Sequence, residues 1–96
     1  MGWRADISKL RSRANELITR ANELRTQENV LNNIINSSRS YWEGEASDVY
    51  RKQVAILNDH IKRTRNKLSS SADELRRLAA YIQEVESERA RAAREL

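Results

Sequence analysis

Apolar residues recur at steps of seven in the first part of the chain. One series consists of the leucines Leu10, Leu17, Leu24 and Leu31. A companion series, offset by three positions, holds Ile7, Ala14, Ala21, Glu28 and Ile35. Such a heptad pattern gathers both series on one side of an α-helix, where a second helix can pack against them. The pattern predicts a helix from about residue 6 to residue 38.

A second heptad pattern occupies the other half of the chain. Its main series is Val54, Ile61, Leu68, Leu75 and Ile82, and we expect a companion series at Tyr50, Leu57, Thr64, Ser71, Leu78 and Val85. This pattern predicts a second amphipathic helix over about 46–90. A tail over about 87–96 is rich in Glu, Arg and Ala.

The two patterns are separated by a stretch that weakens helical structure. Ser37, Ser38 and Ser40 have low helix propensity, and Gly44 gives the backbone freedom to reverse. A single uninterrupted helix is the alternative, but it would put Val49 rather than Tyr50 on the seam. We therefore predict an all-α fold in which one domain, residues 1–96, forms an antiparallel helix-turn-helix hairpin with its turn over about 39–45.

Some apolar residues near the turn lie off both heptad seams. They are Val30 and Ile34 in the first helix and Val49 and Ile56 in the second. A hairpin of 96 residues buries little apolar surface on its own, so these residues predict a second interface. A dimer that forms a four-helix bundle would cover them. The alternative is that they are isolated surface residues with no role.

One polar residue, Glu28, occupies a position in the first seam. In a hairpin it falls near the basic stretch from Lys62 to Lys67, so we expect an ion pair there.

The composition excludes several classes of function. The chain has no cysteine, a single histidine at His60 and no glycine-rich phosphate loop, so we predict no catalytic residue, cofactor or metal. The net charge of +4 is spread along the chain, and the basic stretch from Lys62 lacks interleaved aromatic residues, which disfavours nucleic-acid binding. The longest aliphatic run, Val54 to Leu57, is too short for membrane insertion or a Sec signal.

The turn contains the sequence Trp42-Glu43-Gly44-Glu45-Ala46, followed by Tyr50. Gly44 suits a chain reversal, Ala46 permits close approach, and Trp42 brings a large apolar ring with one N–H donor. In its length, its two heptad helices and this central motif, the whole chain resembles the WXG family of small early-secreted-antigen-type proteins of type VII secretion systems. In that family Trp-x-Gly lies in the bend of a helical hairpin, and a small residue and an aromatic residue often follow.

The resemblance also points to a C-terminal secretion signal of the form Tyr-x-x-x-Asp/Glu. Here the match is imperfect, because Tyr81 is followed four residues later by Val85, while the spacing of four to Glu86 begins at Ile82. Tyr81 and Glu84 are three apart and still share one side of a helix. The candidate signal residues are thus Tyr81, Ile82, Glu84 and Glu86.

The resemblance implies a small secreted substrate, or a targeting or chaperone subunit, of a bacterial type VII secretion system. The implied partner is a related helical hairpin in a homodimer or heterodimer, with a larger type VII effector and the secretion ATPase as further partners. It also implies export without a signal peptide, from a cytoplasmic pool. The alternative is a generic coiled-coil scaffold or adaptor without a secretion role, which the heptads alone would explain but the central Trp42 and Gly44 would not.

Overall fold

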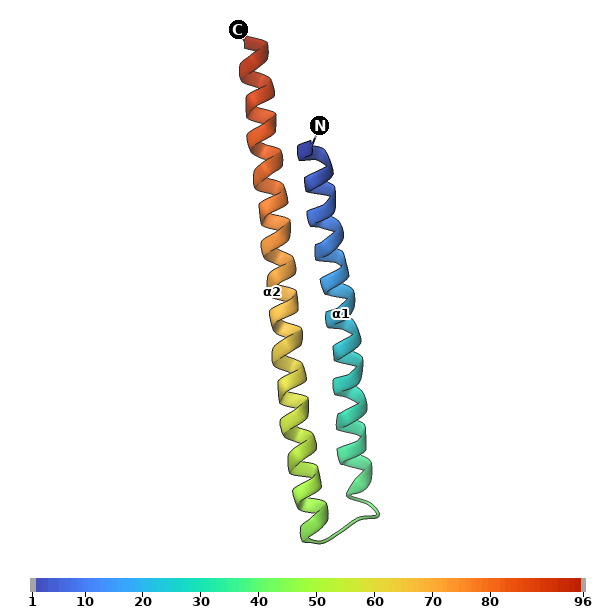
Figure 1. The fold of residues 1–96 in the computed structure, drawn as a ribbon. Helices are drawn as coiled ribbons and strands as arrows, with labels where there is room; N and C mark the ends of the chain where they lie inside the picture. The colour runs from blue at the N-terminus through green and yellow to red at the C-terminus, as the bar shows by residue number, and fades with distance from the viewer. Residues whose placement is uncertain (1, 96) are drawn as a thin grey trace. The chain divides into compact units, whose positions relative to one another are not determined.

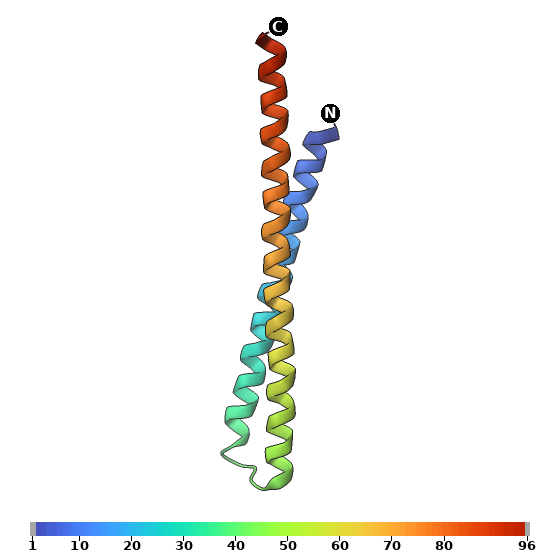
Figure 2. The ribbon, with the colours of Figure 1, turned by 90° about the vertical axis from the view of Figure 1, so that its left-hand side faces the viewer.

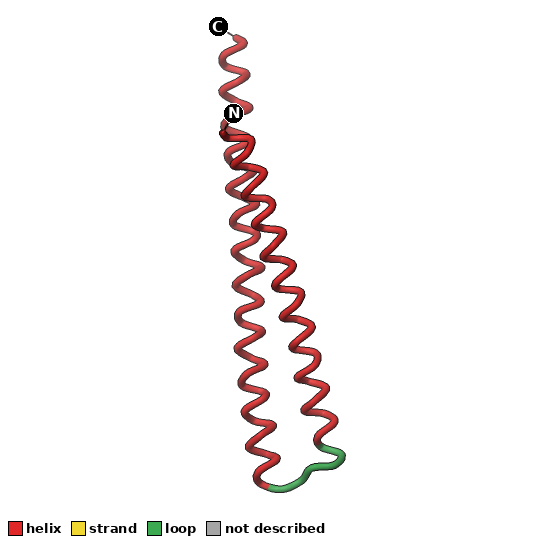
Figure 3. Tube along the Cα trace, turned by 45° about the vertical axis from the view of Figure 1, so that its right-hand side comes forward, coloured by secondary structure: helices red, strands yellow, loops and turns green. Residues whose placement is uncertain are grey.

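The computed structural model describes residues 2–95 and consists, over that range, of two α-helices (Figure 1). Helix α1 spans Gly2–Ser38 and helix α2 spans Glu45–Glu95. The short connection between them is drawn in green in Figure 3. No strand occurs among the described residues, so the predicted all-α helix-turn-helix hairpin is confirmed. Helix α1 begins before the predicted residue 6 and ends at Ser38 as predicted, whereas α2 continues past the predicted residue 90, so the segment predicted as a tail is helical to Glu95.

The described residues form two compact units. The first combines the part of α1 up to Ile18 with the part of α2 from Ser69 onward. The second comprises Thr19–Leu68 and contains the turn. Neither described helix holds a stretch long and apolar enough to cross a membrane.

Small side chains line the seam of the first unit. Ala14, Ala72 and Ala79 are fully buried there, with Ile7 also buried, while Leu10, Leu17, Leu75 and Ile82 are half-buried. Alanine lets two helix backbones approach closely because nothing projects beyond its Cβ. Arg11 donates to Gln83 Oε1 at 2.6 Å and Arg76 donates to Asn15 Oδ1 at 3.1 Å, which fixes the level at which the two segments pair.

The second unit contains the turn and the two helix segments that meet there side by side (Figure 2). Its apolar seam consists of buried Ala21 and Val54 with half-buried Leu24, Leu31, Ile35, Ile61 and Leu68. Polar pairs complete the seam. Arg65 donates a hydrogen bond to the Glu28 carboxylate, and Asn58 donates one to the Asn32 side chain. This unit therefore relies less on apolar burial than its heptad pattern predicts.

The companion series predicted for the second helix is wrong at every position except its last, Val85, which is half-buried. Leu57 and Leu78, which we expected in the seam, are 51% and 46% exposed, and Tyr50, Thr64 and Ser71 are exposed as well. The companions of Val54, Ile61, Leu68 and Leu75 instead lie four residues later, and they are Asn58, Arg65, Ala72 and Ala79. Ala72 and Ala79 allow the two helix backbones to approach closely, and Asn58 and Arg65 bond polar residues of α1. This side of α2 therefore packs against α1 in preference to the side that carries Leu57 and Leu78.

Candidate functional site at the turn and its apolar side

The turn is closed by a small set of backbone hydrogen bonds. The Trp42 N–H donates to the Ser38 carbonyl at 2.9 Å, which ends α1, and the Asp48 N–H donates to the Gly44 carbonyl at 3.1 Å, which begins α2. Gly44 has φ = 110°, a left-handed value that favours glycine, and no other described residue has a positive φ. Glu45 and Asp48 add negative charge to the first turn of α2, where the helix dipole favours it.

Two aromatic residues of the motif pack against each other beside the turn. The ring centroids of Trp42 and Tyr50 are 5.1 Å apart, with the ring planes tilted by 45°. Both side chains remain partly exposed, at 37% and 41%, and Ala46 in the first turn of α2 is exposed as well. We call Trp42 and Tyr50 the aromatic pair. A tilted pair at this distance stabilises its own geometry and still presents ring surface to a partner.

Arg51 is a residue of this site that sequence reasoning missed. Its guanidinium donates to Ser38 Oγ at 3.3 Å and to the Trp42 carbonyl at 3.1 Å through Nη1. Through Nη2 it donates to Ser47 Oγ at 3.1 Å and to Asp48 Oδ1 at 3.0 Å. The signal that could have indicated it is spacing, because Arg51 precedes Asn58 and Arg65 at steps of seven.

The exposed apolar residues of the second unit do not all lie on one side of it. On α1, Val30 and Ile34 lie across the seam from Asn32, which bonds α2. On α2, Leu57 lies across the seam from Asn58, and Tyr50 precedes it by one heptad. Since the Asn32–Asn58 bond joins the opposite edge of the seam, Val30, Ile34, Tyr50 and Leu57 share one side of the hairpin.

We call these four residues the apolar side. It leads toward the turn, where Tyr50 is also a member of the aromatic pair. Val49 and Ile56 are exposed too, but helical spacing places them on the back of α2, away from α1. The predicted second interface of Val30, Ile34, Val49 and Ile56 therefore divides in two, and the first two residues join Tyr50 and Leu57.

The opposite side of the second unit is polar. Arg65 donates to the Glu28 carboxylate at 2.5 Å and 3.3 Å, and Asn58 Nδ2 donates to Asn32 Oδ1 at 2.8 Å. The ion pair expected between Glu28 and the basic stretch is thus confirmed, with Arg65 as the partner. A shallow groove of about 390 Å³ runs beside these pairs and is lined in addition by Asp59 and Lys62. One side of this unit is therefore polar and the other is the apolar side.

The Glu28–Arg65 pair predicts a pH dependence. The hydrogen bond from Arg65 lowers the pKa of Glu28 below its ordinary value of 4.5. The stabilisation is therefore fully present above that ordinary pKa and is lost as the pH falls through the lowered, folded-state pKa. Replacing Glu28 with glutamine should lower the melting temperature at pH 7, and the difference from wild type should persist down to the ordinary pKa of 4.5 and shrink below it when melting is followed by circular dichroism.

Glu16 provides a matched control for this experiment. Its pair with Arg13 lies within α1 and both side chains are well exposed, so Glu16→Gln should change melting little at any pH. A difference between wild type and Glu28→Gln that stayed constant from pH 7 to pH 3 would contradict the assigned role of the ion pair.

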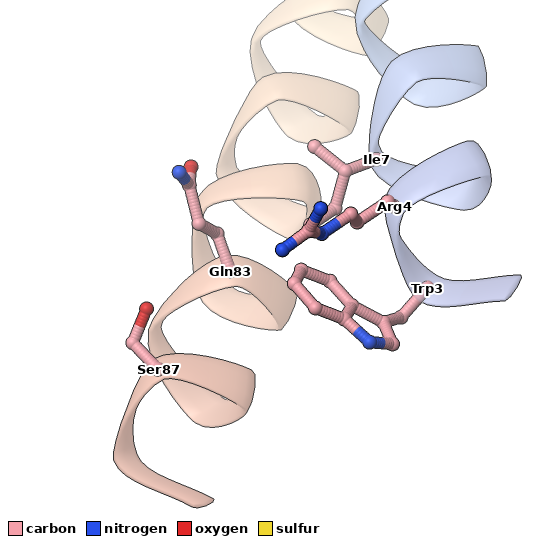
Figure 4. A pocket seen from close by; sticks show the side chains of 5 residues that line it. All are labelled: Trp3, Arg4, Ile7, Gln83 and Ser87. Carbon is pink, nitrogen blue, oxygen red and sulfur yellow. The ribbon is translucent and has the colours of Figure 1, made fainter. Parts of the chain in front are cut away.

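In the first unit, the N-terminal end of α1 forms a pocket with α2. The pocket has a volume of about 320 Å³ and is lined by Trp3, Arg4, Ile7, Gln83 and Ser87 (Figure 4). The Arg4 guanidinium lies 5.2 Å from the centroid of the Trp3 ring, within the range of a cation–π contact. Trp3 precedes the first heptad, and the sequence pattern gave it no partner.

The candidate signal residues of α2 point in two directions. Tyr81 is 64% exposed and Glu84 is exposed beside it, whereas Ile82 and Glu86 are half-buried. Glu86 also forms an ion pair with Arg89, with 3.5 Å between Glu86 Oε1 and Arg89 Nη1. Of the two possible pairings, only Tyr81 with Glu84 is thus presented to the surroundings.

No group of three or more His, Cys, Asp or Glu side chains over residues 2–95 converges as a metal site. What the described chain does present is a helical hairpin with a partly exposed aromatic pair and an apolar side in one unit. These features define the class of the protein as a small helical-hairpin module.

The family model WXG100, described as "Proteins of 100 residues with WXG", matches residues 3–87. The chain therefore belongs to the WXG100 family and is a small protein associated with type VII secretion. Comparisons with curated proteins and with solved structures gave no match.

Membership in the family implies three further properties. WXG100 proteins are small secreted helical proteins that are not known as enzymes. They commonly associate as helical dimers. Membership also implies type VII secretion by a route that does not use a signal peptide.

Proposed function

We propose that this protein is a small secreted substrate, or a targeting or chaperone subunit, of a bacterial type VII secretion system. It acts by pairing its apolar side with a second helical hairpin, identical or related, to form a four-helix bundle. The single observation that carries this proposal is the apolar side of the second unit, where Val30, Ile34, Tyr50 and Leu57 are exposed together.

The energetics of the second unit support pairing. Ala21 and Val54 are buried in its seam and five Leu and Ile side chains are half-buried there, while four large side chains on the apolar side stay exposed by between 36% and 51%. Covering a large apolar side chain contributes about 1.5–3 kcal/mol, so completing the burial of each of these contributes roughly half of that. A partner that meets the apolar side would thus add substantially to the apolar burial that the seam of this unit supplies.

We further propose that Tyr81 and Glu84 serve as the export signal. Both are exposed on α2, as recognition by a larger effector or by the secretion ATPase requires. The signal would act on a cytoplasmic pool of folded hairpins before export. Ile82 and Glu86, which are half-buried, would instead contribute to the packing of α2 and not to the signal.

The test of pairing is a substitution on the apolar side with a matched control next to it. Leu57→Arg puts a charge on the apolar side, whereas Ile56→Arg puts the same charge on the back of α2 at nearly the same exposure, 50% against 51%. We expect light scattering after size-exclusion chromatography to give a dimer for wild type and for Ile56→Arg. Leu57→Arg should weaken pairing by about 30-fold, the effect of losing roughly 2 kcal/mol at an interface centre.

The melting temperature supplies a second readout, because mass action makes it rise with concentration only in a chain that associates. We expect this rise for wild type and Ile56→Arg and a much smaller one for Leu57→Arg. A wild-type mass of one chain at all concentrations would exclude self-pairing, and equal behaviour of the two variants would exclude the apolar side as the interface.

A further inference from the structure

The guanidinium of Arg51 joins three parts of the second unit that are separate in sequence. Its four acceptors belong to the end of α1 (Ser38), to the turn (the Trp42 carbonyl) and to the first turn of α2 (Ser47 and Asp48). Only 15% of the side chain is exposed. An arginine offers five donors in a rigid planar fork, and four hydrogen bonds here use most of that capacity.

The two serines are oriented to accept from Arg51. Ser38 and Ser47 are buried, at 1% and 0% exposure. The Ser38 hydroxyl donates to the Ile35 carbonyl at 2.8 Å, and the Ser47 hydroxyl donates to the Gly44 carbonyl at 2.7 Å. Each hydroxyl has one proton and has donated it to a carbonyl, so toward Arg51 it can only accept. The lone pairs of both hydroxyl oxygens accept from the guanidinium. Both helix ends are thereby tied to one side chain.

The same guanidinium fixes the backbone that carries Trp42. The Trp42 carbonyl accepts from Arg51, and the Trp42 N–H donates to the Ser38 carbonyl, so both polar backbone groups of this residue are held. Tyr50, the other member of the aromatic pair, immediately precedes Arg51 on α2. The direction of the indole relative to the Tyr50 ring therefore depends on where Arg51 holds the turn.

We propose that Arg51 is the positioning residue of the aromatic pair, which it holds in one orientation at the end of the apolar side for a partner to contact. The contribution of Arg51 to partner binding rests on the proposed function. Its contribution to the orientation of Trp42 does not, and the two can be measured separately.

Of the four acceptors of Arg51, Asp48 contributes least to holding the guanidinium in place. Asp48 is 76% exposed, and an ion pair with a carboxylate in water is worth little. The proposal therefore depends on the serines and the Trp42 carbonyl, which lysine cannot join because an ammonium lacks the planar fork. Arg51→Lys thus removes the fork and keeps the charge.

The experiment uses the full chain with Trp3→Phe, so that Trp42 is the only tryptophan. Leu57→Arg is added for the fluorescence measurements to remove any contribution of pairing to the exposure of Trp42. In this background we expect Arg51→Lys to keep its far-ultraviolet circular dichroism, to lose near-ultraviolet aromatic signal and to increase acrylamide quenching of Trp42. With Leu57 restored, the same substitution should weaken dimerisation by about tenfold, which corresponds to roughly 1.4 kcal/mol.

Arg76→Lys is the matched control, because Arg76 makes one interhelical hydrogen bond, to Asn15, far from the turn in sequence. It should leave Trp42 quenching unchanged. Unchanged quenching and near-ultraviolet signal in Arg51→Lys would overturn the proposal. If Arg51→Lys loses helicity, Ser38→Ala with Ser47→Ala decides the matter in the same assay: increased quenching supports the proposal and unchanged quenching overturns it.

The two proposals fail in different measurements. A wild-type chain that does not self-pair removes the homodimer from the proposed function but leaves the quenching of Trp42 as a valid test of Arg51. A wild-type chain that pairs, with Trp42 quenching unaffected by Arg51→Lys, retains the proposed function and removes the role of Arg51.

Discussion

Replacing Ala79 with leucine should lower the free energy of unfolding by about 1–3 kcal/mol, the usual cost of adding methylenes to a filled site. Ala79 has no exposed surface, and neither has Ala14 on α1. The Arg11–Gln83 and Arg76–Asn15 hydrogen bonds lie on either side of the level that these two alanines share. Leucine would have to push the helix backbones apart. For a chain of this size each kcal/mol corresponds to roughly 4–8 °C of melting temperature, which circular dichroism measures readily.

Ala80 offers the control for this substitution. It is the next residue on α2 and is exposed, so leucine there adds the same atoms without entering the seam. Ala80→Leu should change the free energy of unfolding by less than about 0.5 kcal/mol. Equal effects of leucine at 79 and at 80 would contradict the close-packed alanine seam.

Replacing Trp42 with alanine should abolish export while leaving most of the helical structure in place. The indole is more than a third exposed, and its main described contact is the tilted stacking with Tyr50. The hydrogen bonds that close the turn use the Trp42 backbone, which alanine retains. The protein should therefore keep its far-ultraviolet circular dichroism but fail to appear in the medium of a host that carries the cognate type VII system.

Trp3→Ala is the comparison, since it removes the other tryptophan, at the N-terminal end of α1. We expect that variant to be exported. Loss of helicity in Trp42→Ala would mean that the ring serves to close the hairpin, and normal export of a folded Trp42→Ala would remove the aromatic pair from recognition.

The fold followed from the sequence because both of its signals are local. Heptad leucines such as Leu17 and Leu24 indicate one helix, and the change of register around Gly44 indicates where the chain reverses. The sequence of α2 alone does not determine which of its sides packs against α1. It depends on Ala72 and Ala79 approaching α1 closely and on Arg65 finding Glu28, and counting apolar residues gives weight to Leu57 and Leu78 instead.

The same distinction separates the parts of the candidate site. Trp42 and Gly44 could be singled out because they form a short motif at the midpoint of the chain. Arg51 could not, since its role depends on acceptors from Ser38, Ser47 and the Trp42 carbonyl that only the folded turn brings together. A heptad model assigns an arginine on a helix to solvent unless the opposite helix is known.

The alanines of the first unit also bear on how easily its two helix segments separate. Ala14, Ala72 and Ala79 bury little apolar area each, so parting them exposes little new hydrocarbon to water. Most of the resistance to separation therefore comes from the half-buried Leu10, Leu17, Leu75 and Ile82 beside them and from the Arg11–Gln83 and Arg76–Asn15 hydrogen bonds.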